Sequence, residues 1–91
     1  MVIKLEDIFL KMLPCIDLHG YDSESARVAT DDFINDNIQL KNKKILIIHG
    51  KGEGIVKRSV HETLNRRKEV TKYYTYYKND GCTIVHLMLD K

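Results

Sequence analysis

Residues 45–54 read Ile45-Leu46-Ile47-Ile48-His49-Gly50-Lys51-Gly52-Glu53-Gly54, an apolar run that ends in three glycines separated by single residues. An unbroken apolar run predicts a strand buried on both faces. The glycines allow a sharp turn that exposes backbone N–H groups where the next helix begins. Such amides attract phosphate, and Lys51 adds a mobile positive charge. The same pattern also fits an ordinary turn between a strand and a helix, so the loop alone leaves both interpretations open.

The size and composition predict one small domain. With 91 residues, 43% of them hydrophobic, the chain can form a single core. Cys15 and Cys82 lie within apolar runs, as buried reduced thiols do, and no signal sequence or long apolar span precedes them. We therefore expect a cytoplasmic protein with no membrane partner.

Charge is distributed unevenly along the chain. The formal net charge is only +2, but residues 1–40 carry −5, residues 41–78 carry +8 and residues 79–91 carry −1. A segment this basic is expected to bind a polyanion such as nucleic acid. A solvated helix face rich in lysine and arginine gives the same count, and charge alone does not separate the two.

A short helix is predicted at the N-terminus. Apolar residues at positions 5, 8, 9 and 12 share one helical face, and Pro14 ends the pattern. We expect a helical extension over residues 1–13, packed on a main domain of residues 14–91. The polar face has no stripe of lysines, which argues against a helix lying on a membrane surface.

A strand and a helix are predicted before the glycine-rich stretch. Cys15 to Gly20 alternates apolar and polar residues, as a strand does, and Asp22 is a good N-cap for a helix that runs to about Leu40. The apolar stripe of this helix comprises Ala26, Ala29, Phe33, Ile34 and Ile38, whereas Asp31, Asp32 and Asp36 are expected to face out.

The connection between the two strands predicts a meeting of polar side chains. A right-handed crossover makes the strands parallel, so that their C-terminal ends share one edge of the sheet. Asp17 and His19 project from one face of the first strand, and His49 follows the second, so we expect the three to converge. A carboxylate beside an imidazole fixes its tautomer and raises its basicity. A strand end facing water would show the same residues.

The second predicted helix runs from about Gly54 to Arg67 and is strongly basic. Its buried side is expected to hold Ile55, Val56, Val60 and Leu64. His61 is expected on the outer face, away from any site. The polar side carries Lys57, Arg58, Arg66, Arg67 and Lys68.

A β-hairpin is predicted from residues 70–77 and 82–89, joined by a turn at 78–81. His86 in its second strand has no partner visible in the sequence. The first strand carries lysines and tyrosines on one face, which suits stacking on bases, although cross-strand packing explains the same pattern. These residues are Lys72, Tyr74, Tyr76 and Lys78.

Three motifs follow one another in a familiar order. They are Ile16-Asp17-Leu18-His19-Gly20, Ile47-Ile48-His49-Gly50-Lys51-Gly52-Glu53-Gly54 and Gly81-Cys82-Thr83-Ile84-Val85. In order and spacing they resemble the motifs of the Smr (small MutS-related) domain, over about residues 14–90. The resemblance implies a two-layer α/β sandwich of βαβαββ order with a four-stranded mixed sheet whose last strand is antiparallel. This fold is similar to the C-terminal domain of bacterial translation initiation factor three.

The resemblance also implies a site and an activity. Smr domains include endonucleases that nick DNA or cleave RNA on ribosomes, and others that bind without cutting. The catalytic residues that the resemblance implies are Asp17, His19 and His49. The glycine-rich loop itself predicts Gly50, Lys51, Gly52 and Gly54 as phosphate-binding residues. From the basic helix we add Lys57, Arg58, Arg66 and Arg67 as predicted nucleic-acid contacts.

Two functions stay open at this point. In an endonuclease, His19 oriented by Asp17 transfers protons, His49 supplies the complementary transfer or binds phosphate, and the loop stabilises phosphoryl charge. A non-catalytic module for nucleic acid or the ribosome needs the basic segment but not Asp17. A dimerisation domain that uses the N-terminal helix has the least support. A single carboxylate at the site argues against a two-metal mechanism, and we expect neither a metal nor a cofactor.

Overall fold

The structure, a computed structural model, describes residues 11–89. Its elements follow the order β1 (Cys15–Asp17), α2 (Ser23–Gln39), β2 (Lys44–Ile48), α3 (Ile55–Arg66), β3 (Val70–Thr75) and β4 (Cys82–Leu87). The predicted βαβαββ order is therefore confirmed. The helix expected over residues 1–13 falls almost wholly outside the described residues and stays a prediction, as does the division at residue 14.

The four strands form one mixed sheet in the order β1-β2-β4-β3. β1 runs parallel to β2, with Asp17 beside Ile48, and β4 runs antiparallel to both of its neighbours. The predicted mixed sheet and its antiparallel last strand are confirmed. β1 is shorter than expected because the chain turns away at Gly20, where φ is +82°.

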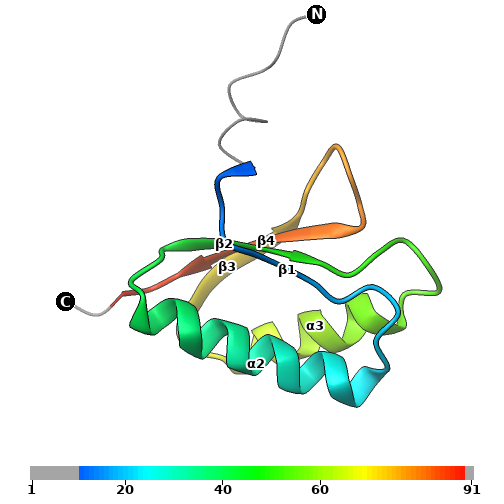
Figure 1. Cartoon of the computed structure of the whole chain (residues 1–91), viewed down its shortest axis with the longest axis horizontal. Coiled ribbons are helices and arrows are strands. Elements are labelled where there is room, and N and C mark those ends of the chain that lie inside the picture. Colours follow the sequence, from blue (N-terminus) through cyan, green and yellow to red (C-terminus); the bar gives the residue numbers. More distant parts are fainter. Residues whose placement is uncertain (1–10, 90–91) are drawn as a thin grey trace, which may run out of the picture.

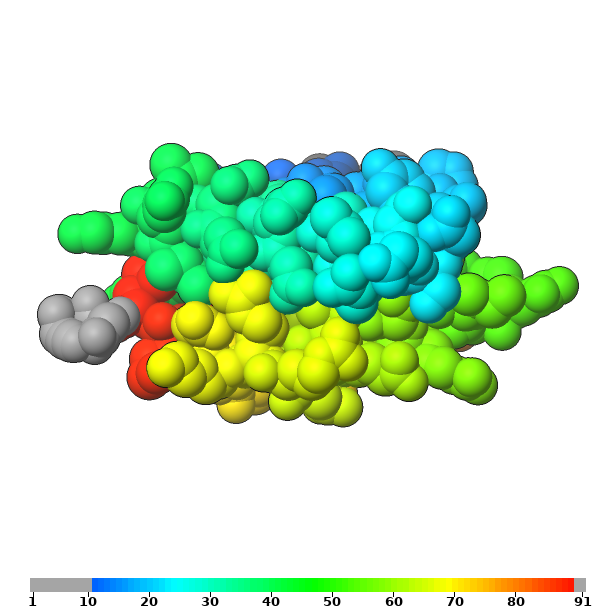
Figure 2. All heavy atoms as spheres, turned by 90° about the horizontal axis from the view of Figure 1, so that it is seen from below, coloured from blue at the N-terminus to red at the C-terminus, as the bar shows by residue number. Residues whose placement is uncertain are grey.

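Both helices cover the same face of the sheet (Figure 1). Seen from the helix side, α2 and α3 lie next to each other along their lengths (Figure 2). β2 sends Ile45 and Ile47 into the core beneath them and Leu46 to the opposite face, as a strand buried on both sides does. The core under the helices comprises Leu18, Ala26, Ile34, Ile45, Ile47, Val56, Val60, Leu64, Val85 and Leu87.

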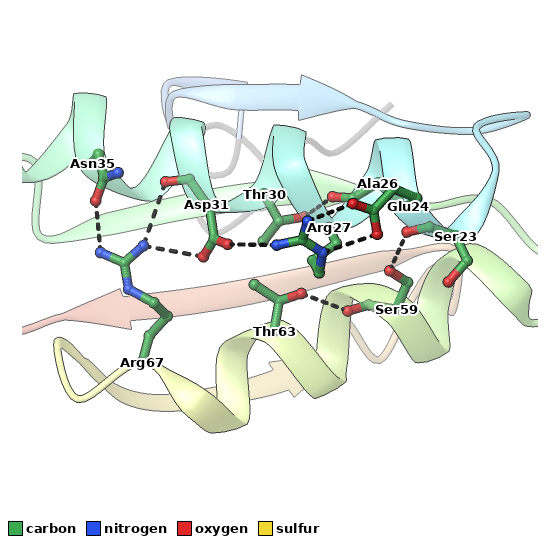
Figure 3. Close-up of polar contacts among 10 residues, drawn as sticks. All are labelled: Ser23, Glu24, Ala26, Arg27, Thr30, Asp31, Asn35, Ser59, Thr63 and Arg67. Atoms are coloured by element: carbon green, nitrogen blue, oxygen red, sulfur yellow. Dashed lines mark hydrogen bonds and ion pairs between the residues drawn. The ribbon is translucent and has the colours of Figure 1, made fainter.

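The contact between α2 and α3 is made partly by small polar side chains. The hydroxyls of Thr30 and Thr63 donate to carbonyl oxygens one turn back in their own helices, over 2.7 and 2.8 Å (Figure 3). The Ser59 hydroxyl crosses the interface and donates to the Ser23 carbonyl oxygen over 2.7 Å. Because each hydroxyl has its partner, these residues are buried without leaving a polar group unpaired.

Arg67, directly after α3, ties the two helices together at their other end. Its guanidinium donates to Asp31 Oδ1 over 3.1 Å, to Asn35 Oδ1 over 2.7 Å and to Glu69 Oε1 over 3.1 Å (Figure 3 shows the first two). The prediction that Asp31 faces out is therefore wrong, because Arg67 reaches across to it. The N-cap prediction is confirmed, since Asp22 Oδ1 accepts from the Ser25 amide over 2.7 Å.

The face of the sheet opposite the helices has a small apolar cluster of its own. Leu46, Cys82 and Ile84 are buried there, with Leu13, Ile48 and Tyr76 packed against them. Burial of the Cys82 thiol is as predicted, but Cys15 is exposed, because β1 is an edge strand with a neighbour on one side only. Over residues 11–89 the structure contains no helix that is both long and apolar enough to cross a membrane.

Candidate active site

Asp17 and His19 form a hydrogen-bonded pair at the end of β1. The carboxylate oxygen Asp17 Oδ1 lies 2.7 Å from His19 Nδ1 and also accepts from the His19 amide over 3.1 Å. These bonds lower the pKa of Asp17, the side-chain bond most. A carboxylate can only accept, so Nδ1 carries the proton and Nε2 is left as the basic nitrogen. The pair has the geometry of an oriented general base.

The glycine-rich loop after β2 turns as its sequence predicts. Gly50 and Gly54 have φ angles of +85° and +88°, in the left-handed region that favours glycine. A Cβ on Gly50 would lie 3.2 Å from the Cβ of His19, so the loop passes directly over the catalytic candidate. Gly54 is the N-cap of α3, and no side chain caps this helix end. The amides of its first turn are therefore available to an anion.

A cleft of about 610 Å³ lies between these two segments and the N-terminal ends of both helices. Lys57 of α3 lines it, and Lys51 lies on its rim in an exposed ion pair with Asp80, with Nζ and Oδ1 3.8 Å apart. Ile55 was expected to be buried, but it is 54% exposed because it faces this opening. The lining consists of residues 19–23 and 49–57.

His49 lines the edge of the cleft, but its imidazole lies on the helix side of the sheet, with Thr83 and with His61 of α3. Leu18 packs into the helix-side core, so its neighbours Asp17 and His19 project from the opposite face. His49 is only 3% exposed, and its Nε2 lies 2.8 Å from the hydroxyl of Thr83. The prediction that the two parallel strands end at one edge of the sheet is confirmed. The imidazole of His49, however, does not point toward that of His19.

His61 does not lie on the outer face of α3, and that prediction is wrong. Its Nε2 lies 2.9 Å from the same hydroxyl of Thr83, and its ring packs 4.9 Å from that of Tyr73, centroid to centroid. The rings of His49 and His61 meet edge to face at 5.8 Å. A polar helix residue faces the sheet here because Thr83 of β4 supplies a buried hydrogen-bonding partner.

The protons in this cluster can be assigned from the partners. His49 Nδ1 lies 3.1 Å from the Gly50 carbonyl oxygen, which only accepts, so Nδ1 carries the hydrogen. His49 Nε2 must then accept from the Thr83 hydroxyl, which in turn accepts from His61 Nε2–H. Burial lowers the pKa of both imidazoles, in agreement with two neutral rings. The cluster is thus a chain of hydrogen bonds in which His61 donates to Thr83, Thr83 donates to His49, and His49 donates to the Gly50 carbonyl oxygen.

The four basic residues predicted to contact nucleic acid lie in different surroundings. Lys57 lines the cleft and Arg58 is exposed next to it, near the start of α3. Arg66 lies eight residues further along α3, about 12 Å away at roughly 1.5 Å per residue. Arg67 is held by Asp31, Asn35 and Glu69, and its side chain is only 18% exposed. The structure therefore places Arg67 in the contact between the two helices, and its role as a nucleic-acid contact stays a prediction.

Gly81 and Thr83 contribute to the site but were not singled out as site residues from the sequence. The Gly81 carbonyl oxygen accepts from the amides of both His49 and Gly50, over 2.8 and 3.0 Å. A Cβ on Gly81 would lie 3.1 Å from the carbonyl carbon of Gly50, so the two loops touch at their backbones. The motif Gly81-Cys82-Thr83 was visible in the sequence, but its contacts in the site lie 22 to 34 residues away along the chain. Among residues 11–89, no three His, Cys, Asp or Glu side chains gather closely enough to hold a metal ion.

These features define a two-layer α/β domain with a cleft where two parallel strands end. The chain belongs to the Smr domain family, whose sequence model matches residues 16–88. It is similar to the Endonuclease MutS2 of Clostridium tetani (strain Massachusetts / E88), with 38% identity over 68 residues, 75% of this chain and 9% of that protein. For Endonuclease MutS2 of Clostridium botulinum (strain Eklund 17B / Type B), identity is 35% over 82 residues, 87% of this chain and 10% of the other. The chain thus spans about a tenth of the length of these relatives.

Two solved structures share the fold. The Smr domain of Thermus thermophilus MutS2 is 26% identical, with a TM-score of 0.80 over 82% of this chain and 98% of that one. YdaL from Escherichia coli, a stand-alone small MutS-related protein, is 25% identical, with a TM-score of 0.73 over 81% of this chain and 63% of that one. The resemblance found in the sequence motifs is therefore confirmed.

Proposed function

We propose that this Smr domain binds nucleic acid in the cleft and cleaves a phosphodiester bond there. The observation that carries the proposal is the bond of 2.7 Å between Asp17 Oδ1 and His19 Nδ1 at the rim of a cleft closed by the glycine-rich loop. The name of the relatives, Endonuclease MutS2, supports it. Because the chain spans about a tenth of those proteins, their activity is carried over as a proposal.

In the proposed reaction His19 Nε2 takes a proton from the attacking oxygen, either water or a ribose hydroxyl. That oxygen forms a bond to phosphorus while the bond from phosphorus to the leaving oxygen breaks, and the leaving oxygen takes up a proton from the imidazolium or from water. The amides at the start of α3, with Lys51 and Lys57, stabilise the charge on the phosphoryl oxygens. We assign His49 the role of positioning the loop, because both of its ring nitrogens have partners.

The remaining parts of the proposal concern partners and location. Arg58 and Arg66, both exposed on α3, are proposed to contact phosphates, and DNA, RNA and ribosome-bound RNA are all candidate partners. Cys15 and Cys82 are free thiols, which agrees with the reducing cytoplasm as the compartment.

A binding module without cleavage is the second candidate. It is favoured by the burial of His49. Among the residues that line the cleft, this leaves His19 as the exposed imidazole. A single imidazole must then both accept and return the proton. In this alternative Asp17 and His19 shape the rim, and the basic residues supply the affinity.

Asp17→Asn tests the proposal, because it removes the carboxylate charge and keeps the size of the side chain. Cleavage of labelled single- and double-stranded RNA and DNA is expected to fall by roughly two to four orders of magnitude, and His19→Ala is expected to do the same. Binding, measured by fluorescence anisotropy, is expected to survive in both. Asp32→Asn on the exposed side of α2 is the matched control and is expected to cleave normally.

The outcomes separate the two candidates. Wild-type protein that binds a strand and leaves it intact, with and without added divalent cations, identifies the binding module. Cleavage that persists in both Asp17→Asn and His19→Ala contradicts the assigned roles. Absence of both binding and cleavage on all four substrates rejects the proposed function.

A further inference from the structure

The face of the sheet opposite the helices carries a row of basic side chains. Lys72 of β3 is paired with His86 of β4, which is paired with Lys44 of β2, so the three lie side by side across three strands. Tyr73 and Val85, which alternate with them along β3 and β4, belong to the helix-side core. Because successive strand residues point to opposite faces, the row lies on the face that α2 and α3 leave uncovered (Figure 1).

Tyr74 lies in the adjacent row, paired with Ile84, and is 41% exposed. Its ring centroid lies 5.7 Å from that of His86, and its hydroxyl lies 3.1 Å from His86 Nε2, so the ring is held in one place. The ammonium nitrogen of Lys72 lies 5.9 Å from the centroid of the same ring. An exposed, oriented aromatic ring with an ammonium group beside it is a surface on which a nucleobase can stack.

No acidic side chain of β2, β3 or β4 neutralises the positive charge of Lys44 and Lys72. β2, β3 and β4 contain no aspartate or glutamate. Glu69, just before β3, is already bonded to Arg67. Burial lowers the pKa of His86, and the charges of Lys72 and Lys44 lower it further. A surface of this kind attracts an anionic partner.

The row shares its face with the rim of the cleft. Asp17 is paired with Ile48, and Ile48 packs against the cluster that contains Ile84. Ile48 and Lys44 lie four residues apart on β2, or about 13 Å at roughly 3.3 Å per residue. A strand of nucleic acid that leaves His19 along this face would reach Tyr74 within a few nucleotides.

We propose that Lys44, Lys72, Tyr74 and His86, here named the distal sheet patch, bind single-stranded nucleic acid. A base stacks on Tyr74, and the two lysines contact the flanking phosphates. This inference rests on the proposed function and names its substrate class. A duplex fits less well, because its bases are stacked on one another and offer the flat sheet only their phosphates.

The chain contains no tryptophan, so a single introduced indole reports on one place. Tyr74→Trp labels the distal sheet patch, and Tyr21→Trp labels the cleft, which Tyr21 lines. An unlabelled single-stranded oligonucleotide of about 12 nucleotides is expected to quench the emission of both reporters. A blunt duplex of the same sequence and a polyglutamate peptide are expected to leave the Tyr74→Trp emission unchanged.

Variants of the patch measure its share of the affinity. Tyr74→Ala is expected to weaken single-strand binding roughly 5- to 150-fold. Lys44→Gln with Lys72→Gln is expected to lower the slope of log affinity against log salt by about 0.7 for each phosphate that the patch no longer neutralises. The matched control is Lys41→Gln with Lys43→Gln, which removes the same charge from exposed positions directly before β2. Circular dichroism and thermal midpoints establish that each variant is folded.

Several results would overturn the inference. Quenching of Tyr21→Trp with an unchanged Tyr74→Trp signal rejects the distal sheet patch and leaves the cleft in place. Equal quenching of Tyr74→Trp by duplex or polyglutamate rejects the single-stranded substrate class, and an equal reduction in the lysine control rejects a specific site. If neither reporter responds to single strands and anisotropy detects no binding, the inference fails together with the proposed function.

Discussion

Thr83 is the hydrogen-bonding partner of two imidazoles, that of the buried His49 and that of the half-buried His61. Its hydroxyl donates to His49 and accepts from His61, so Thr83→Val, which keeps the shape, leaves both Nε2 atoms without a partner. The free energy of unfolding is expected to fall by about 1–3 kcal/mol, the cost of unpaired buried polar groups. Thr83→Ser keeps the hydroxyl and is expected to lose clearly less. Urea unfolding measures both, and equal stability of the two variants would contradict the proton chain.

Gly50 is constrained by its backbone conformation and by its close approach to His19. Gly50→Ala requires a φ of +85° and brings a Cβ to 3.2 Å from that of His19. Stability is expected to fall by about 1 kcal/mol, and cleavage or binding at the cleft is expected to fall more, because His19 is displaced. Gly52→Ala is the matched control, since a Cβ there has nothing within 4 Å and no positive φ is required. A thermal melt and a cleavage assay compare them, and an equal effect of the two changes would contradict this constraint.

At the scale of elements, Arg66 and Arg67 are neighbours in sequence with different roles. Arg67 links the end of α3 to α2 through Asp31 and Asn35, whereas Arg66 is exposed in the last turn of α3. Arg67→Ala is expected to lower the free energy of unfolding by roughly 2 kcal/mol, because it leaves charged and polar partners unpaired. Arg66→Ala is expected to change stability by less than about 0.5 kcal/mol and to weaken nucleic-acid binding. Denaturant unfolding and a binding titration distinguish them, and the reverse pattern would refute the assignment.

At the scale of the whole molecule, three histidines couple stability to pH. Burial lowers the pKa of His49, His61 and His86 in the folded chain. The unfolded chain takes up protons near pH 6.5 and the folded chain only below that, so acid favours unfolding. We expect the free energy of unfolding to be at its full value above about pH 6.5. It then falls with decreasing pH, by at most about 1.4 kcal/mol per pH unit for each histidine.

A substitution identifies the source of this pH dependence. His61→Phe removes one of the three imidazoles and is expected to flatten the curve between about pH 6.5 and pH 5. The pKa of Asp17 is also lowered, so its contribution is present above its ordinary value of 3.8 and is lost only in stronger acid. Urea unfolding at several pH values measures the curve. A wild-type stability that stays constant down to pH 5 would contradict the lowered pKa values of these imidazoles.

The local pattern of the sequence determined the elements and their order. The apolar run before Gly50, the N-cap Asp22 and the crossover between two strands predicted a parallel pair with a polar edge, and the structure has it. The pair Asp17 and His19 was also predictable, because residues two apart on a strand share a face. These features depend on residues close together in the chain, where periodicity and turn chemistry are sufficient.

Only the tertiary structure decided which polar groups meet across the fold. His49 and Thr83 are 34 residues apart, and Arg67 and Asp31 are 36 apart, so no local period predicts either contact. His61 and Arg67 look like solvated helix residues because their buried partners come from a distant strand and a distant helix. Cys15 looks buried because its sequence neighbours are apolar, but its exposure follows from the edge position of β1 in the sheet. Pairing and strand order are non-local, and they determine whether a polar side chain finds water or a partner.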